Sequence, residues 1–112
     1  MRSDAQLLAD IRDNIDLARQ FTDGLTLERF AAETKSLYAT IRCLEIISEA
    51  SRGLSPELKQ RHPQIRWAQI AGAGNVYRHD YERITPDVIW KTVHGALPAL
   101  LDAAMSELGA GP

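Results

Sequence analysis

The chain has 112 residues, which is enough for one domain with a single core. Hydrophobic residues make up 45% and charged residues 25%, so the composition is that of an ordinary soluble globular protein and excludes the disordered class. No stretch approaches the roughly 20 apolar residues that a membrane-spanning helix needs. The formal net charge of −2 argues against a protein that coats nucleic acid by bulk electrostatics.

The first predicted helix begins at a capping-box pattern, in which Ser3 is followed three residues later by Gln6. Apolar residues at helical spacing carry this helix to about Phe21, and Gly24 ends the region. Acidic residues recur along it, where a secretory signal would need an apolar run. We therefore expect a cytoplasmic protein.

One long second helix is predicted from a cap at Thr26 to Arg52, with Gly53 as its stop. Cys43 lies among apolar residues of this helix, and we expect it to be a core thiol. Ser55-Pro56-Glu57 then supplies an N-cap, a proline at the first helical position and a first-turn acid. The short helix that follows must end at His62-Pro63.

A fourth helix is predicted over 67–78, although its internal glycines weaken it locally. Thr85-Pro86-Asp87 starts a last helix that continues to Leu108, with a kink expected at Pro98 because proline lacks the backbone donor. No alternating strand pattern or internal repeat is present. The sequence therefore predicts an all-α, up-and-down bundle of four to five helices, in a single domain over 1–112 with a short flexible tail at about 109–112.

Three polar side chains lie on one face of the predicted fourth helix: Asn75, Arg78 and His79, at spacing i, i+3, i+4. Histidine transfers protons near neutral pH, arginine binds phosphate, and asparagine orients either neighbour. In RNA the adjacent 2′-hydroxyl is an internal nucleophile, so such a set suits phosphodiester cleavage without a metal. The structural alternative is a helix-end histidine that only complements the helix dipole.

No metal site and no cofactor are predicted, because the three histidines lack His-x-x-x-His spacing and there is no second cysteine. The segment 59–83 carries five basic residues and two acids, so a localised basic patch is one interpretation and chance clustering is the other.

Motifs along almost the whole chain resemble the HepT-like branch of the HEPN superfamily. They are Glu49-Ala50, Leu54-Ser55-Pro56-Glu57, Trp67-Ala68-Gln69-Ile70-Ala71-Gly72, Asn75-Val76-Tyr77-Arg78-His79-Asp80-Tyr81, Ile89-Trp90 and Leu97-Pro98. This resemblance implies a small all-α homodimer that acts as a toxin beside a minimal nucleotidyltransferase antitoxin. It also implies metal-independent RNA cleavage by an arginine, four intervening residues, a histidine, one residue and a tyrosine.

His79-Asp80-Tyr81 matches the second half of that motif, whereas Gly74 stands where the family has its arginine. Arg78, directly before His79, is the candidate replacement. The resemblance further implies that the nucleotidyltransferase transfers AMP to Tyr81, which would add bulk and negative charge beside His79. Tyr77, on the same helix, is expected to pack in the interior.

Three functions remain open at this point. The leading one is a toxin ribonuclease with His79, Arg78 and Asn75 in a groove shared by two subunits. A second is a catalytically silent subunit that docks a nucleotidyltransferase, which Gly74 favours. The third is a structural helical dimer without chemistry.

Overall fold

The computed structural model describes residues 2–109, except for the side chain of Tyr81. The described residues form helices and no strand, which confirms the predicted all-α class. The elements in chain order are α1 (Asp4–Thr22), α2 (Leu27–Ala32), α3 (Thr34–Arg52), α4 (Pro56–Arg61), α5 (Trp67–His79), the 3₁₀ turn η1 (Tyr81–Arg83), α6 (Pro86–Lys91), the π-helical turn η2 (Thr92–Ala96) and α7 (Leu97–Gly109).

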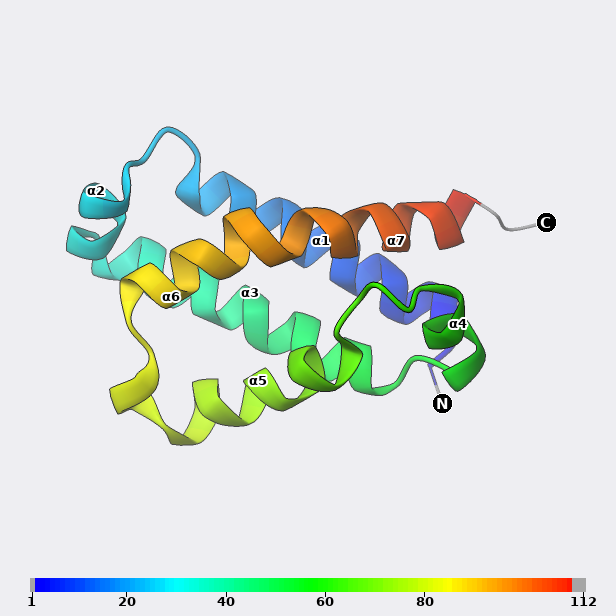
Figure 1. The fold of residues 1–112 in the computed structure, drawn as a ribbon. Coiled ribbons are helices and arrows are strands. Elements are labelled where there is room, and N and C mark those ends of the chain that lie inside the picture. Colours follow the sequence, from blue (N-terminus) through cyan, green and yellow to red (C-terminus); the bar gives the residue numbers. More distant parts are fainter. Residues whose placement is uncertain (1, 110–112) are drawn as a thin grey trace.

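Helix α3 is the centre of the bundle, because it packs against α1 on one side and α5 on the other (Figure 1). Helix α7 packs against α1, so α5 lies at the edge of the molecule and makes its extensive helix contacts with α3 alone. Ile11, Ile15, Phe30 and Ile89 are fully enclosed in the core between these layers. Among residues 2–109, no helix has both the length and the apolar character to span a bilayer.

The capping box at the start of α1 is confirmed. The backbone N–H of Gln6 donates to the Ser3 hydroxyl (3.2 Å), and the Ser3 N–H donates to the Gln6 side chain (2.9 Å). After α1 the chain turns at Gly24, whose φ of 73° lies in the left-handed region that favours glycine.

The prediction of one helix from Thr26 to Arg52 is wrong, because the chain leaves helical geometry at Glu33 (φ −103°, ψ 88°). The break lets α2 turn toward α6, and the rings of Phe30 and Trp90 then lie 5.5 Å apart between centroids. Burial of Phe30 against a residue 60 positions away outweighs the local helix preference, as tertiary packing often does.

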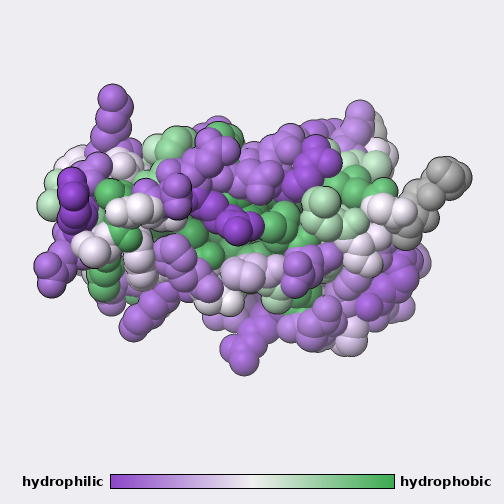
Figure 2. Space-filling model, turned by 90° about the horizontal axis from the view of Figure 1, so that it is seen from above, coloured by the Kyte–Doolittle hydropathy of each residue, from purple (hydrophilic) through white to green (hydrophobic). Residues whose placement is uncertain are grey.

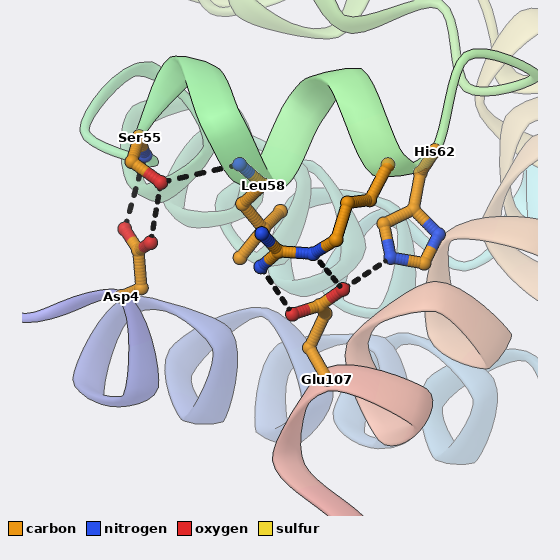
Figure 3. A network of polar contacts seen from close by, with 6 residues as sticks. Asp4, Ser55, Leu58, His62 and Glu107 are labelled. Atoms are coloured by element: carbon orange, nitrogen blue, oxygen red, sulfur yellow. Dashed lines mark hydrogen bonds and ion pairs between the residues drawn. The ribbon is translucent and has the colours of Figure 1, made fainter. Parts of the chain in front are cut away.

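Helix α4 begins and ends as predicted, and two polar clusters tie it to other helices (Figure 3). At its start, the Ser55 hydroxyl and backbone N–H both donate to the Asp4 carboxylate, at 2.6 and 3.0 Å. At its end, Glu107 of α7 accepts two hydrogen bonds from Arg61 (2.7 and 3.1 Å) and lies 2.6 Å from His62 Nε2. The start of α4 is thus fixed to α1 and its end to α7.

These contacts lower the pKa of the Glu107 carboxyl to about 2, chiefly through the hydrogen bonds from Arg61 and then through His62. Glu107 is therefore ionised at neutral pH, and the pair is a bidentate arginine–carboxylate bridge of the stronger kind.

The last predicted helix is present, but its irregular turn lies about one turn before the kink expected at Pro98. Residues 92–96 form a π-helical turn in which the Leu97 N–H donates to the Thr92 carbonyl, five residues back. Pro98 lies just beyond this turn and has no N–H for the regular bond to His94, which gives a physical reason for the irregularity. Gly109, placed in the predicted tail, is the last helical residue, and residues 110–112 lie outside the described part.

Candidate functional site

His79 is the last residue of α5, and its side chain is exposed. The helix ends there because Asp80 adopts non-helical geometry (φ −137°, ψ 67°) while its N–H still donates to the Val76 carbonyl at 3.0 Å. Among the described side chains, none forms a hydrogen bond with the His79 ring. Its exposure lets the ring meet a ligand from solvent.

Of the three residues predicted to share one face of α5, Asn75 and Arg78 are joined by a hydrogen bond. The Arg78 Nη2 donates to the Asn75 side-chain oxygen at 2.9 Å, with Asn75 exposed and Arg78 half-buried. Asn75 shares the exposed side of α5 with His79, and the smaller Gly72 and Ala68 are exposed one and two turns before Asn75. We call these four residues the outer face of α5.

Gly74, at the position of the family arginine, is buried against α3 and has no room for a side chain. A Cβ atom built there would lie 2.7 Å from the hydroxyl and 3.2 Å from the Cβ of Ser48. The next nearest atom is the Arg78 Nη1, at 3.4 Å. The Arg78 guanidinium thus folds back along α5 to the place where a side chain at position 74 would start.

Helices α3 and α5 are joined at this point by hydrogen bonds to the backbone of α5. The Ser48 hydroxyl lies 3.0 Å from the Ala71 carbonyl oxygen and accepts the Gly74 N–H at 3.0 Å. Arg52 donates to the same Ala71 oxygen through Nε (3.0 Å) and Nη2 (2.8 Å). Sequence analysis missed Ser48 and Arg52, because the contacts span 19 to 26 residues and follow no local motif.

The two tyrosines of this region differ. Tyr77 is buried, as predicted, and burial raises the pKa of its phenol while a hydrogen bond with Thr92 partly offsets the rise. Tyr81 begins the 3₁₀ turn after α5, but its side chain lies outside the described part of the structure. Trp67 and Trp90 are partly buried and pack against the core.

The predicted basic patch over 59–83 is smaller than the sequence indicates. Arg61 pairs with Glu107, and Arg83 lies 3.7 Å from the Asp80 carboxylate. Arg78 donates to a neutral amide, and within residues 2–109 no carboxylate lies within 4.0 Å of its guanidinium. Arg78 therefore supplies positive charge next to His79, but the segment 59–83 as a whole does not form a broad basic patch.

His79 does not line either of two hollows in the described part of the structure. One, of about 530 Å³, is bordered on α5 by Gln69, Ile70, Ala73 and Tyr77, which are not on the outer face. Hydrophobic side chains also form a strip between hydrophilic margins on the face shown in Figure 2. Within residues 2–109, no three His, Cys, Asp or Glu side chains gather in a group that could hold a metal ion.

The chain matches the family model described as ribonuclease HepT-like over residues 11–106. It is 37% identical over 99 residues to a protein of Thermococcus cleftensis named probable ribonuclease HepT, covering 88% of this chain and 90% of the relative. It is 31% identical over 93 residues to a protein of Methanocaldococcus jannaschii named putative RNase, covering 83% of this chain and 85% of the relative. No solved structure matches at a significant level. With 96 of its residues inside the family model, the chain belongs to the HepT-like ribonuclease family.

Proposed function

We propose that this protein is a metal-independent endoribonuclease, the toxin of a toxin–antitoxin pair, which cuts RNA in a groove shared by two copies of the chain. The observation that carries the proposal is the exposed His79 ring, one turn beyond the Asn75–Arg78 hydrogen bond on an edge helix. The names of the relatives support ribonuclease chemistry.

In the proposed reaction His79 accepts the proton of a ribose 2′-hydroxyl, whose oxygen attacks the adjacent phosphorus. The bond from phosphorus to the 5′-oxygen breaks, and that oxygen takes a proton from the imidazolium of the second copy. Arg78 neutralises the charge that develops on the phosphate oxygens, and Asn75 holds the guanidinium in place. Positioned acid–base groups of this kind typically contribute about 10²–10⁴-fold in rate.

We propose a second copy because the outer face of α5 forms only one side of a groove. No heavy atom lies within 4 Å of a Cβ built at Gly72, so another helix could approach the backbone closely there. A two-fold axis that runs beside the outer face, along the length of α5, would place the two copies of Asn75 and of His79 across one groove. Oxidative cross-linking of a Gly72→Cys variant should then give covalent dimers, whereas Gly95→Cys, on η2, should not.

Inhibition is proposed to come from a minimal nucleotidyltransferase antitoxin that transfers AMP to Tyr81. The phenol oxygen would attack the α-phosphorus of ATP and release pyrophosphate. The new phosphodiester would stand two residues from His79, where its negative charge repels the RNA backbone. Incubation with the antitoxin and ATP should increase the mass of the wild-type chain by one or more AMP groups, and should leave Tyr81→Phe unmodified.

The test of the main proposal is RNA cleavage by purified protein in EDTA. Wild type should cut an RNA oligomer, and a single 2′-deoxy substitution at the cut site should abolish the cut. His79→Ala should lose cleavage and growth inhibition while keeping its oligomeric state. If the wild-type protein cuts no RNA of any sequence tested, the nuclease proposal is wrong.

A catalytically silent subunit that docks a nucleotidyltransferase is the alternative function. The burial of Gly74 under Ser48 favours it, since no arginine side chain can extend from position 74 in this packing. In that case His79→Ala should change neither growth inhibition nor partner binding, whereas changes at Tyr81 should weaken modification.

A further inference from the structure

We propose that Arg52 of α3 is a second phosphate-binding arginine, which together with Arg78 holds the RNA backbone on either side of Gly74. This inference rests on the proposed function and extends it to the binding of the substrate. Its basis is a series of short distances that places the two arginines on either side of Gly74.

The contacts run from one guanidinium to the other across the α3–α5 junction. Arg52 Nη2 lies 2.8 Å from the Ala71 oxygen, which lies 3.0 Å from the Ser48 hydroxyl. That hydroxyl lies 2.7 Å from the position of a Cβ at Gly74, and Arg78 Nη1 lies 3.4 Å from the same point. Two positive groups on different helices thus flank the one glycine where the family motif has a single arginine.

Within residues 2–109, the charge of Arg52 is not neutralised by a carboxylate. Five other arginines each have a carboxylate within 4.0 Å: Arg2, Arg12, Arg42, Arg61 and Arg83. In the described part of the chain Arg52 has none, and the Ala71 oxygen that it binds is neutral. A guanidinium can form two parallel hydrogen bonds with a phosphate and also pairs with its negative charge, so a phosphate is a better partner than this carbonyl.

The geometry leaves one edge of the guanidinium available. A guanidinium has five N–H groups, and Arg52 directs Nε and Nη2 at the Ala71 oxygen. The Nη1 group and the second Nη2 hydrogen remain, and they form the planar fork that binds phosphate in a bidentate manner. The Ala71 oxygen also accepts from Ser48, so α5 keeps a bond to α3 if Arg52 turns from the carbonyl toward a phosphate.

The experiment measures binding of a fluorescent RNA oligomer with 2′-O-methyl groups throughout, which cannot be cleaved through the 2′-oxygen. Binding of wild type, Arg52→Gln, Arg52→Lys and Arg66→Gln is followed by anisotropy between 50 and 200 mM KCl. Arg66 is the matched control, because it is exposed, has no described carboxylate partner and borders the hollow on the other side of α5.

We expect Arg52→Gln to raise the Kd about tenfold or more. It should also lower the slope of log Kd against log [KCl] by about 0.7, which is the loss of one phosphate contact on a single strand. Arg52→Lys should keep the slope and raise the Kd about threefold or more, since it keeps the charge without the fork. Arg66→Gln should stay within about twofold of wild type.

The inference is overturned if Arg52→Gln, folded by circular dichroism, binds like Arg66→Gln. A purely structural role at the α3–α5 junction would lower the melting temperature of that variant and leave the Kd and slope unchanged. If Arg52→Gln does not fold, Arg52→Lys decides, and a wild-type Kd for it overturns the inference. Failure of wild type to bind the oligomer also overturns it.

The two proposals fail separately. If the oligomer binds through Arg52 but unmodified RNA is never cut, the nuclease proposal fails and the phosphate site stands. If wild type cuts RNA and Arg52→Gln has the same kcat and KM, the phosphate site fails and the nuclease stands.

Discussion

Two histidines end two helices of this protein, and their surroundings are opposite. His62, the C-cap of α4, is 12% exposed and lies 2.6 Å from the Glu107 carboxylate, which Arg61 also binds (Figure 3). His79, the last residue of α5, is exposed and has no hydrogen-bond partner among the described side chains. A bound histidine stabilises the bundle, whereas an open one is available for chemistry.

The same contrast extends to the helices that carry them. Helix α4 is fixed at both ends by carboxylates from α1 and α7. Helix α5 is an edge helix fixed near its middle by Ser48 and Arg52 of α3, so its C-terminal turn projects beyond the junction. The fold thus stabilises one end of the bundle and leaves the other accessible.

The largest effect is expected from His79→Ala, which should lower the rate of RNA cleavage by about 10²–10⁴-fold, the usual contribution of an acid–base group. Because His79 is exposed, the melting temperature should change little. His62→Ala is the matched control, with a lower melting temperature and a cleavage rate near wild type below that temperature. Equal loss of activity in both variants would remove the distinction between the two histidines.

The largest effect on stability is expected from removing the Glu107 carboxylate, which binds the end of α4. Glu107→Gln leaves Arg61 and the half-buried His62 without their carboxylate, and should lower the free energy of unfolding by about 2–3 kcal/mol near neutral pH. Urea unfolding measures the difference.

The pH dependence of that difference follows from the lowered pKa of Glu107. The folded-state pKa of about 2 lies below the ordinary value of 4.5, so the stabilisation is fully present above about pH 4.5 and is lost as pH falls toward 2. The gap between wild type and Glu107→Gln should therefore narrow between pH 6 and pH 2.5. A gap that stays constant over this range would show that the carboxylate charge is not the cause.

A smaller effect on stability is expected where Gly74 of α5 packs against α3. Gly74→Ala places a Cβ 2.7 Å from the Ser48 hydroxyl and should lower the free energy of unfolding by about 1–2 kcal/mol, despite the better helix propensity of alanine. Gly95→Ala, with open space around its Cβ and outside the proposed dimer interface, should raise it by about 0.4–1 kcal/mol. Both are measured by urea unfolding at one protein concentration. The same sign for both variants would contradict the close approach at Gly74.

The smallest effect is expected from Asn75→Ala, which removes the 2.9 Å bond that orients Arg78. The pair is exposed, so the unfolding free energy should change by less than about 0.5 kcal/mol. We expect kcat for RNA cleavage to fall several-fold while KM changes less, because Arg78 remains but is less well positioned. An unchanged kcat would show that Asn75 does not orient a catalytic group.

Local chemistry explains what the sequence could predict. The caps at Ser3 and Ser55 depend on neighbours three residues away, and the Asn75–Arg78 pair follows from helical spacing. These features need no knowledge of the fold. The resemblance to the HepT-like family, which rests on motifs along the chain, is confirmed by the family match over residues 11–106.

Long-range contacts explain what the sequence could not predict. The break at Glu33 depends on Phe30 meeting Trp90, and the Glu107 cluster joins residues 45 and 46 positions apart. The role of Ser48 and Arg52 depends on α3 lying against α5, and no spacing in the sequence indicates which arginines lack an acid partner.

The central claim is that the open histidine transfers the proton of a 2′-hydroxyl, and mass spectrometry of the RNA ends tests it most directly. In EDTA, wild type should produce 2′,3′-cyclic phosphate and 5′-hydroxyl ends, and His79→Ala should produce neither. Ends with a 3′-hydroxyl and a 5′-phosphate, or the same cyclic ends from His79→Ala, would contradict the account.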